Sequence, residues 1–297
     1  MAKLIECVPN ISEGRRLDVV EQIVDTVRGK DGVKLLDYSS DADHNRTVIT
    51  LVGEPEALKN ALVEFVGRAV ELIDLREHQG QHPRMGAVDV IPFIPIKEVS
   101  VAEAVELSKE LAQTLYEKYR VPSFLYESSA SADHRKNLAT LRKGEFEGMA
   151  DKVKTEEFRP DYGEDIHPSY GITAIGARPF LVAFNINLAT DDIEIANKVA
   201  KAVRHISGGL RYVKGMGVRL EDRGIVQVSM NLTDFTKTPI YRVFELVKLE
   251  AARYGVEVVG SEVIGLVPMA SLIDCATWYL RTEDFKLDQV LEYQLME

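Results

Sequence analysis

The feature that most constrains the fold is an order of apolar segments that occurs twice along the chain. In residues 3–95 the patterning predicts strand, helix, strand, strand, helix and strand, and residues 180–267 show the same order. This is the order of the split β-α-β unit of ferredoxin-like domains. The sequence therefore predicts an α/β (α+β) protein of two ferredoxin-like β-α-β-β-α-β subdomains with a cleft or tunnel between them.

Apolar periodicity sets the expected elements of the first half. We expect strands at residues 3–9, 33–38, 47–52, 87–95 and 121–126, and helices at residues 17–28, 54–75 and 101–119. The strand at 87–95 reads as ended by its prolines, Pro92 and Pro95. Residues 39–46 read as a charged loop.

A long stretch without clear periodicity follows. Residues 127–170 are polar and irregular, which predicts a functional connection or linker rather than regular structure. We place the subdomain boundary near its end, which gives subdomains of residues 1–178 and 179–297. The second half then predicts strands at 180–188, 210–220, 224–232 and 256–267, and helices at 191–206, 240–254, 269–280 and 285–296.

Charge and cysteine usage exclude several classes of protein. The net charge of −11 argues against general affinity for nucleic acid or for an anionic membrane surface, and no apolar run is long enough to span a membrane. Only Cys7 and Cys275 are present, which excludes a disulfide framework and favours a reducing cytoplasm.

Three polar clusters are candidates for chemistry, and His82 is the strongest. His82 precedes a proline, which disfavours a helix there, and Arg84 supplies a cation two residues later. The second cluster runs from Asp41 through Asp43 to Arg46, and the third is Asn10 with the turn that follows it. Because alternate strands of a split unit are antiparallel, we expect the three clusters to converge at one end of the sheet.

Each cluster also has a structural interpretation. His82 with Arg84 could be an ordinary solvated loop, and Asp41, Asp43 and His44 could form a metal site, although helical His spacing and a calcium loop are both missing. The chain contains no G-x-S-x-G elbow and no phosphate-binding G-x-x-x-x-G-K-[ST] motif.

Five separate motifs resemble the formiminotransferase domain, the folate enzyme of histidine degradation. They occur in that family's order and are CVPNISEG at 7–14, NRTV at 45–48, HPRMGAVDV at 82–90, GARPFLVAFNINL at 176–188 and GSEVIGLVP at 260–268.

The resemblance implies glutamate formimidoyltransferase activity, in which the formimino group of N-formimino-L-glutamate moves to N5 of tetrahydrofolate. It also implies two ferredoxin-like subdomains with a folate tunnel between them, a homodimer, and tetrahydrofolate as cosubstrate with no metal. The helical cyclodeaminase domain of the animal proteins is expected to be absent, which would leave a single-function enzyme.

Residue by residue, His82 matches the family's catalytic histidine. Substrate binding is expected from Asn10, Arg46, Arg84, Asp41 and Asp43. The family's folate-binding segment falls on Gly163, Glu164, Asp165, Ile166, His167, Pro168, Ser169, Tyr170 and Gly171.

The resemblance implies two further roles in this chain. The animal proteins carry a carboxylate near the catalytic histidine where this chain has Ser39, so Asp37, Asp41 or Asp43 is expected to orient His82. Tyr162 or Tyr170 is a candidate to stack on a folate ring.

Three alternative functions stay open at this point. One is formyl transfer from N-formylglutamate or from 5-formyltetrahydrofolate at the same site. A second is a folate-binding protein without catalysis, and a third is a metal-dependent hydrolase that uses Asp41, Asp43, His44 and His82.

Overall fold

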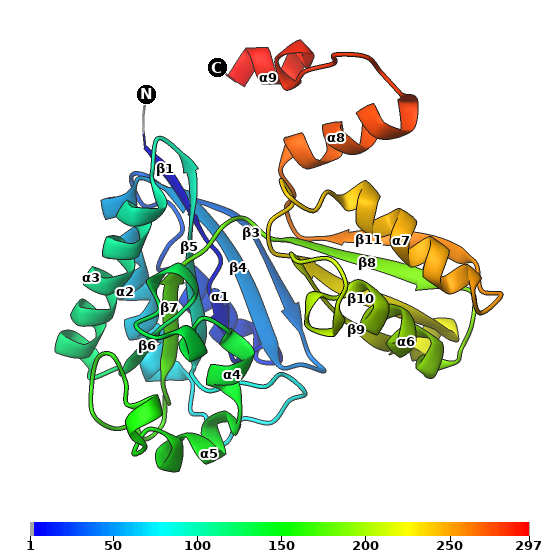
Figure 1. Cartoon of the computed structure of the whole chain (residues 1–297). Helices are drawn as coiled ribbons and strands as arrows, with labels where there is room; N and C mark the ends of the chain where they lie inside the picture. Colours follow the sequence, from blue (N-terminus) through cyan, green and yellow to red (C-terminus); the bar gives the residue numbers. More distant parts are fainter. Residues whose placement is uncertain (1–2, 297) are drawn as a thin grey trace. The chain divides into compact units, whose positions relative to one another are not determined.

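The computed structural model describes residues 3–296 and has a mixed α/β architecture with two sheets (Figure 1). The chain divides into two compact units, one ending at Pro179 and the other beginning at Phe180. In the part of the chain described, no helix is long and apolar enough to cross a membrane. Each unit is described by itself below.

The first unit contains a seven-stranded sheet in the order β3, β4, β1 with β2, β5, β7, β6. The first strand is divided into β1 and β2, and both segments lie between β4 and β5. The strands are β1 Leu4–Cys7, β2 Asn10–Ile11, β3 Val33–Asp41, β4 Arg46–Gly53, β5 Val88–Lys97, β6 Ser123–Leu125 and β7 Thr173–Ala177. β5, β7 and β6 run parallel, whereas the pairings among β1 to β5 are antiparallel.

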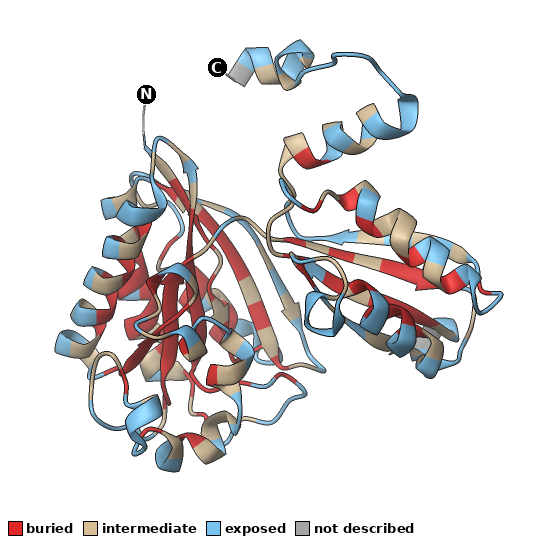
Figure 2. Ribbon diagram, viewed as in Figure 1, coloured by how far each residue is buried: buried red, intermediate tan, exposed pale blue. Residues whose placement is uncertain are grey.

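Three helices cover one face of this sheet and enclose the main core (Figure 2). They are α1 Leu17–Val24, α2 Pro55–Leu72 and α3 Val101–Tyr119. Buried strand residues such as Ile5, Cys7 and Phe93 point into this core, since side chains alternate between the two faces of a strand. A smaller core forms around Val90 and Phe124, with side chains from α4 Leu138–Arg142 and α5 Glu145–Lys152.

The second unit contains a four-stranded antiparallel sheet in the order β11-β8-β10-β9. Its strands are β8 Val182–Leu188, β9 Val213–Leu220, β10 Ile225–Leu232 and β11 Val258–Ile264. α6 Ile193–Val203 and α7 Ile240–Ala252 pack their apolar faces on it. α8 Met269–Leu280 and α9 Leu291–Met296 follow.

Several expected elements agree closely with the structure, and α3 and α8 have the predicted bounds. α3 begins with a capping box, in which the Ser100 hydroxyl accepts from the N–H of Glu103 and the Glu103 carboxylate accepts from the N–H of Ser100. The expected loop at 39–46 was too long, because β3 continues to Asp41 and β4 begins at Arg46.

The expectation that prolines end the fourth strand was wrong. β5 runs through Pro92 and Pro95 to Lys97. Pairing with β7 covers Val90 to Phe93 only, and the ladder to β1 is irregular next to Pro95. Pro95 therefore sits where β5 has one neighbour and an irregular ladder, a position at which a missing N–H is tolerated.

The prediction that residues 127–170 form a connection without regular structure was wrong in part. It contains α4 and α5, and it leads into β7, a strand that the sequence analysis missed. β7 is short and was taken as part of the boundary, because the five residues Thr-Ala-Ile-Gly-Ala show no alternation. The parallel pairings of β7 to β5 and β6 supply the hydrogen bonds that make it a strand.

Candidate active site

His82 lies on the loop between α2 and β5, and only 3% of the residue is exposed. Its backbone N–H donates to the carbonyl of His44 at 3.3 Å, which ties this loop to the turn before β4. The ring Nε2 faces Asp89 Oδ2 at 3.7 Å, longer than a hydrogen bond. Within residues 3–296, Nε2 has no hydrogen-bond partner. The imidazole is therefore held against a carboxylate that it can approach more closely when it is protonated.

Asp89 is a fully buried carboxylate at a bulge in β5. Asn10 pairs with Val90 and Ile11 with Val88, so Asp89 is the extra residue between two regular pairs. A β-bulge changes the direction in which a side chain points, and such bulges are common beside active sites. Here the bulge lets an apolar strand present one carboxylate toward the His82 loop.

Three donors hold the Asp89 carboxylate. Oδ1 accepts from the N–H of Met85 at 2.8 Å, and Oδ2 accepts from Arg142 Nε at 2.7 Å and from its Nη2. Burial acts to raise the pKa of Asp89, but the Arg142 charge, His82 and the Met85 N–H outweigh it, so the pKa is lowered. Asp89 is therefore an ionised, fixed partner for His82.

Burial is also the largest influence on His82, and it lowers the imidazole pKa below its usual range. The negative charge of Asp89 opposes this effect, while Arg142 and Arg46 add to it. His82 is therefore neutral at pH 7 and available to accept a proton.

Arg46, at the start of β4, adds a second positive charge near Asp89. Burial lowers the pKa of its guanidinium, and the nearby Arg142 adds to the effect while Asp41 and Asp89 oppose it. Its Nε is buried and finds no acceptor among the residues described. Arg46 and Arg142 both act on the fully buried Asp89 carboxylate, which leaves a site suited to an anion such as a substrate carboxylate.

The three polar clusters lie together, as predicted. The Asn45 side-chain oxygen accepts from the N–H of Gly14, and the Asp43 carbonyl accepts from the N–H of Gln81. Asn10 is half-buried on β2 and donates to the Val8 carbonyl at 3.1 Å. These contacts join the end of the first strand, the turn before β4 and the His82 loop.

The expected carboxylate partner of His82 was not found among the acidic residues near Ser39. Asp37 and Asp43 are exposed, and the Asp41 carboxylate is bonded to His44, with Nδ1 to Oδ2 at 2.9 Å. Asp89 takes that position instead, because the bulge in β5 turns its side chain toward His82.

Arg84 has protein partners. Its guanidinium donates to Glu147 at 2.6 and 2.9 Å and to Glu145 at 2.8 Å, and its Nε donates to His78. These bonds anchor α5 to the His82 loop, and the Phe146 N–H adds a bond to the Arg84 carbonyl. Arg84 therefore shapes the loop, and a substrate carboxylate would have to compete with two glutamates for it.

The segment Gly163–Gly171 borders the His82 loop. Gly86 bridges to Gly171, and the Ala87 N–H donates to the Tyr170 carbonyl at 2.8 Å. A Cβ on Gly86 would lie 2.3 Å from the Ile172 carbonyl oxygen, so only glycine allows this approach. The end of the predicted folate segment thus pairs with Gly86 and Ala87, which follow the predicted catalytic histidine by four and five residues.

The expectation that a tyrosine of this region stacks on a flat ring was wrong for Tyr170. Its side chain is fully buried, and its hydroxyl bonds to the hydroxyl of Thr173 at 2.6 Å. Tyr170 fills the main core, and Tyr162 is partly buried against the same core. The exposed members of the segment are Glu164, Asp165 and Pro168.

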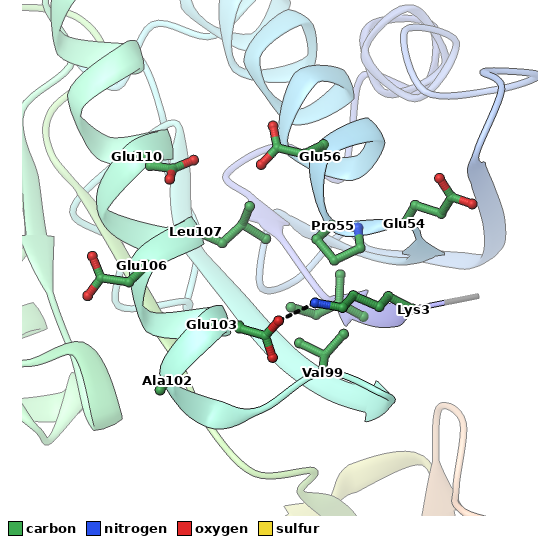
Figure 3. A pocket seen from close by; sticks show the side chains of 11 residues that line it. Lys3, Glu54, Pro55, Glu56, Val99, Ala102, Glu103, Glu106, Leu107 and Glu110 are labelled. Carbon is green, nitrogen blue, oxygen red and sulfur yellow. Dashed lines mark hydrogen bonds and ion pairs between the residues drawn. The ribbon is translucent and has the colours of Figure 1, made fainter. Parts of the chain in front are cut away.

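A cavity of about 710 Å³ lies elsewhere in the first unit, between the start of α2 and the first turns of α3 (Figure 3). Among the described residues, Lys3 is the one cationic residue that lines this cavity. Five glutamates also line it: Glu54, Glu56, Glu103, Glu106 and Glu110. An anionic substrate would be repelled there, and none of the residues around His82 lines it. We therefore assign the chemistry to the His82 cluster and not to this acidic cavity.

Among residues 3–296, no group of three or more His, Cys, Asp and Glu side chains is arranged to hold a metal ion. Asp41 and His44 do meet, but as a pair on an exposed turn. The geometry therefore gives no support to the hydrolase alternative.

Sequence reasoning missed Asp89 and Arg142. A signal for Asp89 was present, since one acidic residue interrupts the apolar run Ala-Val-Asp-Val-Ile. No sequence pattern pointed to Arg142, because it lies 53 residues after Asp89 in a stretch without periodicity.

Comparison with known proteins was made with this geometry in hand. Residues 4–178 match the family model described as the formiminotransferase domain, N-terminal subdomain, and residues 183–295 match the model described as the formiminotransferase domain. A glutamate formimidoyltransferase of Streptococcus pyogenes is 53% identical over 100% of both chains. One of Thermoplasma acidophilum is 44% identical over 98% of this chain and 97% of its own. The formimidoyltransferase-cyclodeaminase of Rattus norvegicus is 41% identical over 95% of this chain and 53% of its own.

Proposed function

The chain belongs to the formiminotransferase family, and we propose that His82 is the general acid–base of its reaction. The activity is that of a glutamate formimidoyltransferase, a folate-dependent transferase of one-carbon metabolism and histidine degradation. The proposal assigns the steps of that reaction to residues of this chain.

In the proposed reaction, N5 of tetrahydrofolate attacks the formimino carbon of N-formimino-L-glutamate. A tetrahedral adduct forms, and the bond from that carbon to the glutamate nitrogen then breaks. His82 accepts the proton that N5 loses and returns it to the departing amine, so the products are 5-formiminotetrahydrofolate and L-glutamate. A neutral imidazole suits the first transfer, and burial keeps His82 neutral.

Asp89 supports both transfers by stabilising the imidazolium that forms between them. Its carboxylate is fixed by Met85 and Arg142, so the imidazolium can move toward it while the carboxylate stays in place. This support is positional and electrostatic, and Asp89 itself keeps its charge throughout.

Substrate binding is proposed for Arg46, whose buried Nε is free among the described side chains, with Asn10 on the neighbouring strand. Arg46 would hold a carboxylate of the donor. Asp41 and Asp43 remain candidates for contact with the polar end of a substrate, and Arg84 remains a candidate only if its glutamates release it.

Folate binding is proposed for residues 163–171. The support is their position beside the His82 loop, joined by the backbone bonds of Gly86 and Ala87. Tetrahydrofolate is the cosubstrate of this family of enzymes.

The remaining proposals concern organisation. We propose subdomains of residues 1–178 and 179–297, which agrees with the ranges of the two family models and with the division after Pro179. The ferredoxin-like assignment is supported by the strand order β11-β8-β10-β9 and by the same order within β3, β4, β1 and β5. A homodimer, a folate tunnel and a cytoplasmic location stay predictions.

The observation that carries the proposal is the buried His82 imidazole facing the fixed Asp89 carboxylate. The test is turnover of formiminoglutamate with tetrahydrofolate by wild type, by His82→Asn and by His205→Asn, an exposed histidine of the second unit. We expect His82→Asn to lose a factor of about 10² or more, as for removal of a general acid–base, and His205→Asn to match wild type.

Two results would contradict this assignment. Full activity in His82→Asn would remove the acid–base role. Wild type that binds folate without turnover of formiminoglutamate, but uses N-formylglutamate or 5-formyltetrahydrofolate, would favour formyl transfer; folate binding with no turnover of either donor would favour a carrier.

A further inference from the structure

Glu6, in the middle of β1, is a buried carboxyl without a full set of partners. Its side chain is 5% exposed, and its Oε2 accepts no hydrogen bond from any residue in the described range. A buried acceptor left unpaired costs folding free energy, and an apolar side chain would fill this place without that cost. The residue therefore needs an explanation other than stability.

Glu6 lies on the face of the sheet opposite the helices α1 to α3. Its neighbours Ile5 and Cys7 belong to the helix-covered core, so the Glu6 side chain points to the other face. The Arg178 side chain also points to this opposite face, because Ala177, the residue before it, faces the helix-covered core. β5 lies between β1 and β7 (Figure 1). Arg178 directly follows β7, and its N–H still donates to β5.

A row of polar groups crosses the sheet at this level. Glu6 is opposite Ile94 of β5, and the Arg178 N–H donates to the carbonyl of Phe93, the residue before it. Two strand spacings put the Cα atoms of Glu6 and Arg178 about 10 Å apart. Tyr126, at the end of β6, is buried and interacts with the Arg178 side chain.

The charges in this row favour a Glu6 carboxyl that ionises when a ligand donates hydrogen bonds to it. Burial raises the pKa of Glu6 to about 7, and the positive charge of Arg178 only partly offsets it. The carboxyl is thus close to its ionisation point at neutral pH, and donors that a ligand supplies would ionise it. Arg178 and Tyr126 could in turn donate to an acceptor on the same ligand.

The position of Glu6 relative to His82 narrows the choice of ligand. Asn10, four residues after Glu6, pairs with Val90, which follows Asp89. Four residues of strand span about 13 Å, so the carboxyl of Glu6 and the His82–Asp89 pair lie at different levels of the sheet. A single formimino group is too small to contact both, whereas a bicyclic ring with a hydrogen bond of about 3 Å at each end can bridge them.

We propose that Glu6 binds the pterin ring of tetrahydrofolate, with its carboxylate accepting from the 2-amino group and from N3–H while Arg178 or Tyr126 donates to the 4-oxo oxygen. The order of groups on that edge of a pterin, two donors and then an acceptor, matches a carboxylate beside a cation and a phenol. This inference rests on the proposed function, since it assumes folate as the cosubstrate.

The formimino group of the donor carries two nitrogens on one carbon and could present a similar pair of N–H donors. The experiment therefore asks whether the N–H donors that Glu6 accepts come from the pterin of folate or from the formimino group of formiminoglutamate. Folic acid and its 2-deamino analogue are titrated against wild type, Glu6→Gln and the control Glu110→Gln, which removes an exposed carboxylate from α3. The KM for formiminoglutamate is measured for all three proteins, and circular dichroism checks their folding.

We expect wild type and Glu110→Gln to bind folic acid at least about 10-fold more tightly than the 2-deamino analogue, the effect of a hydrogen bond to a charged group. Glu6→Gln should bind folic acid about 10- to 100-fold more weakly and lose the discrimination, with the KM for formiminoglutamate unchanged.

Several results would overturn the inference while leaving the enzyme assignment intact. Retained discrimination in Glu6→Gln, an equal loss of affinity for both ligands, or an effect on formiminoglutamate alone would each do so. If Glu6→Gln does not fold, wild type that binds both ligands equally still overturns it. Wild type that binds no folate and has no turnover would instead refute the proposed function.

Discussion

Replacing Glu6 by glutamine should stabilise the protein, by an amount that grows as pH rises from about 4.5 to about 7 and is then constant. Glu6 is 5% exposed, and burial raises its pKa from 4.5 to about 7. Between these two values the folded protein holds a proton on Glu6 that the unfolded chain has lost. The free energy of unfolding of wild type therefore falls as pH rises through this window, by about 1.4 kcal/mol per pH unit.

The size of the effect follows from the width of the window. From 4.5 to about 7 is about 2.5 pH units, which amounts to about 3 kcal/mol of lost stability above pH 7. Glutamine has the same shape and no charge, so Glu6→Gln escapes this loss. The variant and wild type should therefore be similar near pH 4.5 and differ by about 3 kcal/mol at pH 8.

The assay is urea denaturation at pH 5, 6, 7 and 8, followed by far-ultraviolet circular dichroism. Fluorescence is unsuitable, because the single tryptophan, Trp278, lies in α8 of the second unit whereas Glu6 is in the first. Glu110→Gln removes an exposed carboxylate and serves as the control. A difference between Glu6→Gln and wild type that is the same at pH 5 and pH 8, or a variant less stable than wild type at pH 8, would refute the reasoning.

Three further predictions concern the site and its support. Asp89→Asn should lower turnover by a factor of about 10². It should also move the acidic limb of the kcat/KM profile to lower pH, because loss of the negative charge lowers the pKa of His82. An unchanged pH profile would refute the pairing of Asp89 with His82. Gly86→Ala should reduce both melting temperature and activity, since its Cβ would lie 2.3 Å from a backbone oxygen, and a fully active variant would contradict that contact. Ser100→Ala should cost about 1 kcal/mol in denaturation experiments without changing turnover, because it removes the hydroxyl of a capping box far along the chain from the site.

Much of the fold was predictable from periodicity alone. The helix at 101–119 has five apolar residues in its core-facing stripe and a serine cap, and its bounds agree with the structure. Strand β7 was not predictable in this way, because its hydrogen bonds go to β5 and β6, which precede it by many residues. Local pattern carries no information on such partners.

The site shows the same division. His82, Arg46 and Asn10 were recognisable as polar residues that end or begin strands, and the structure brings their clusters together. The partner of His82 was sought near Ser39, whereas the carboxylate that faces His82 in the structure is Asp89, seven residues after the histidine. A bulge of one residue decides which way Asp89 points, and a bulge depends on the register of the neighbouring strand.

The sequence by itself determined the order of elements, the family motifs and the identity of the candidate acid–base, because apolar period and local turn chemistry are written along the chain. Only the tertiary structure decided which charges face one another. Arg142 reaches Asp89, Arg84 is occupied by two glutamates, and Glu6 is left without a partner for Oε2 among the described residues. These outcomes depend on desolvation and on distances across strands, and neither quantity exists until the chain has folded.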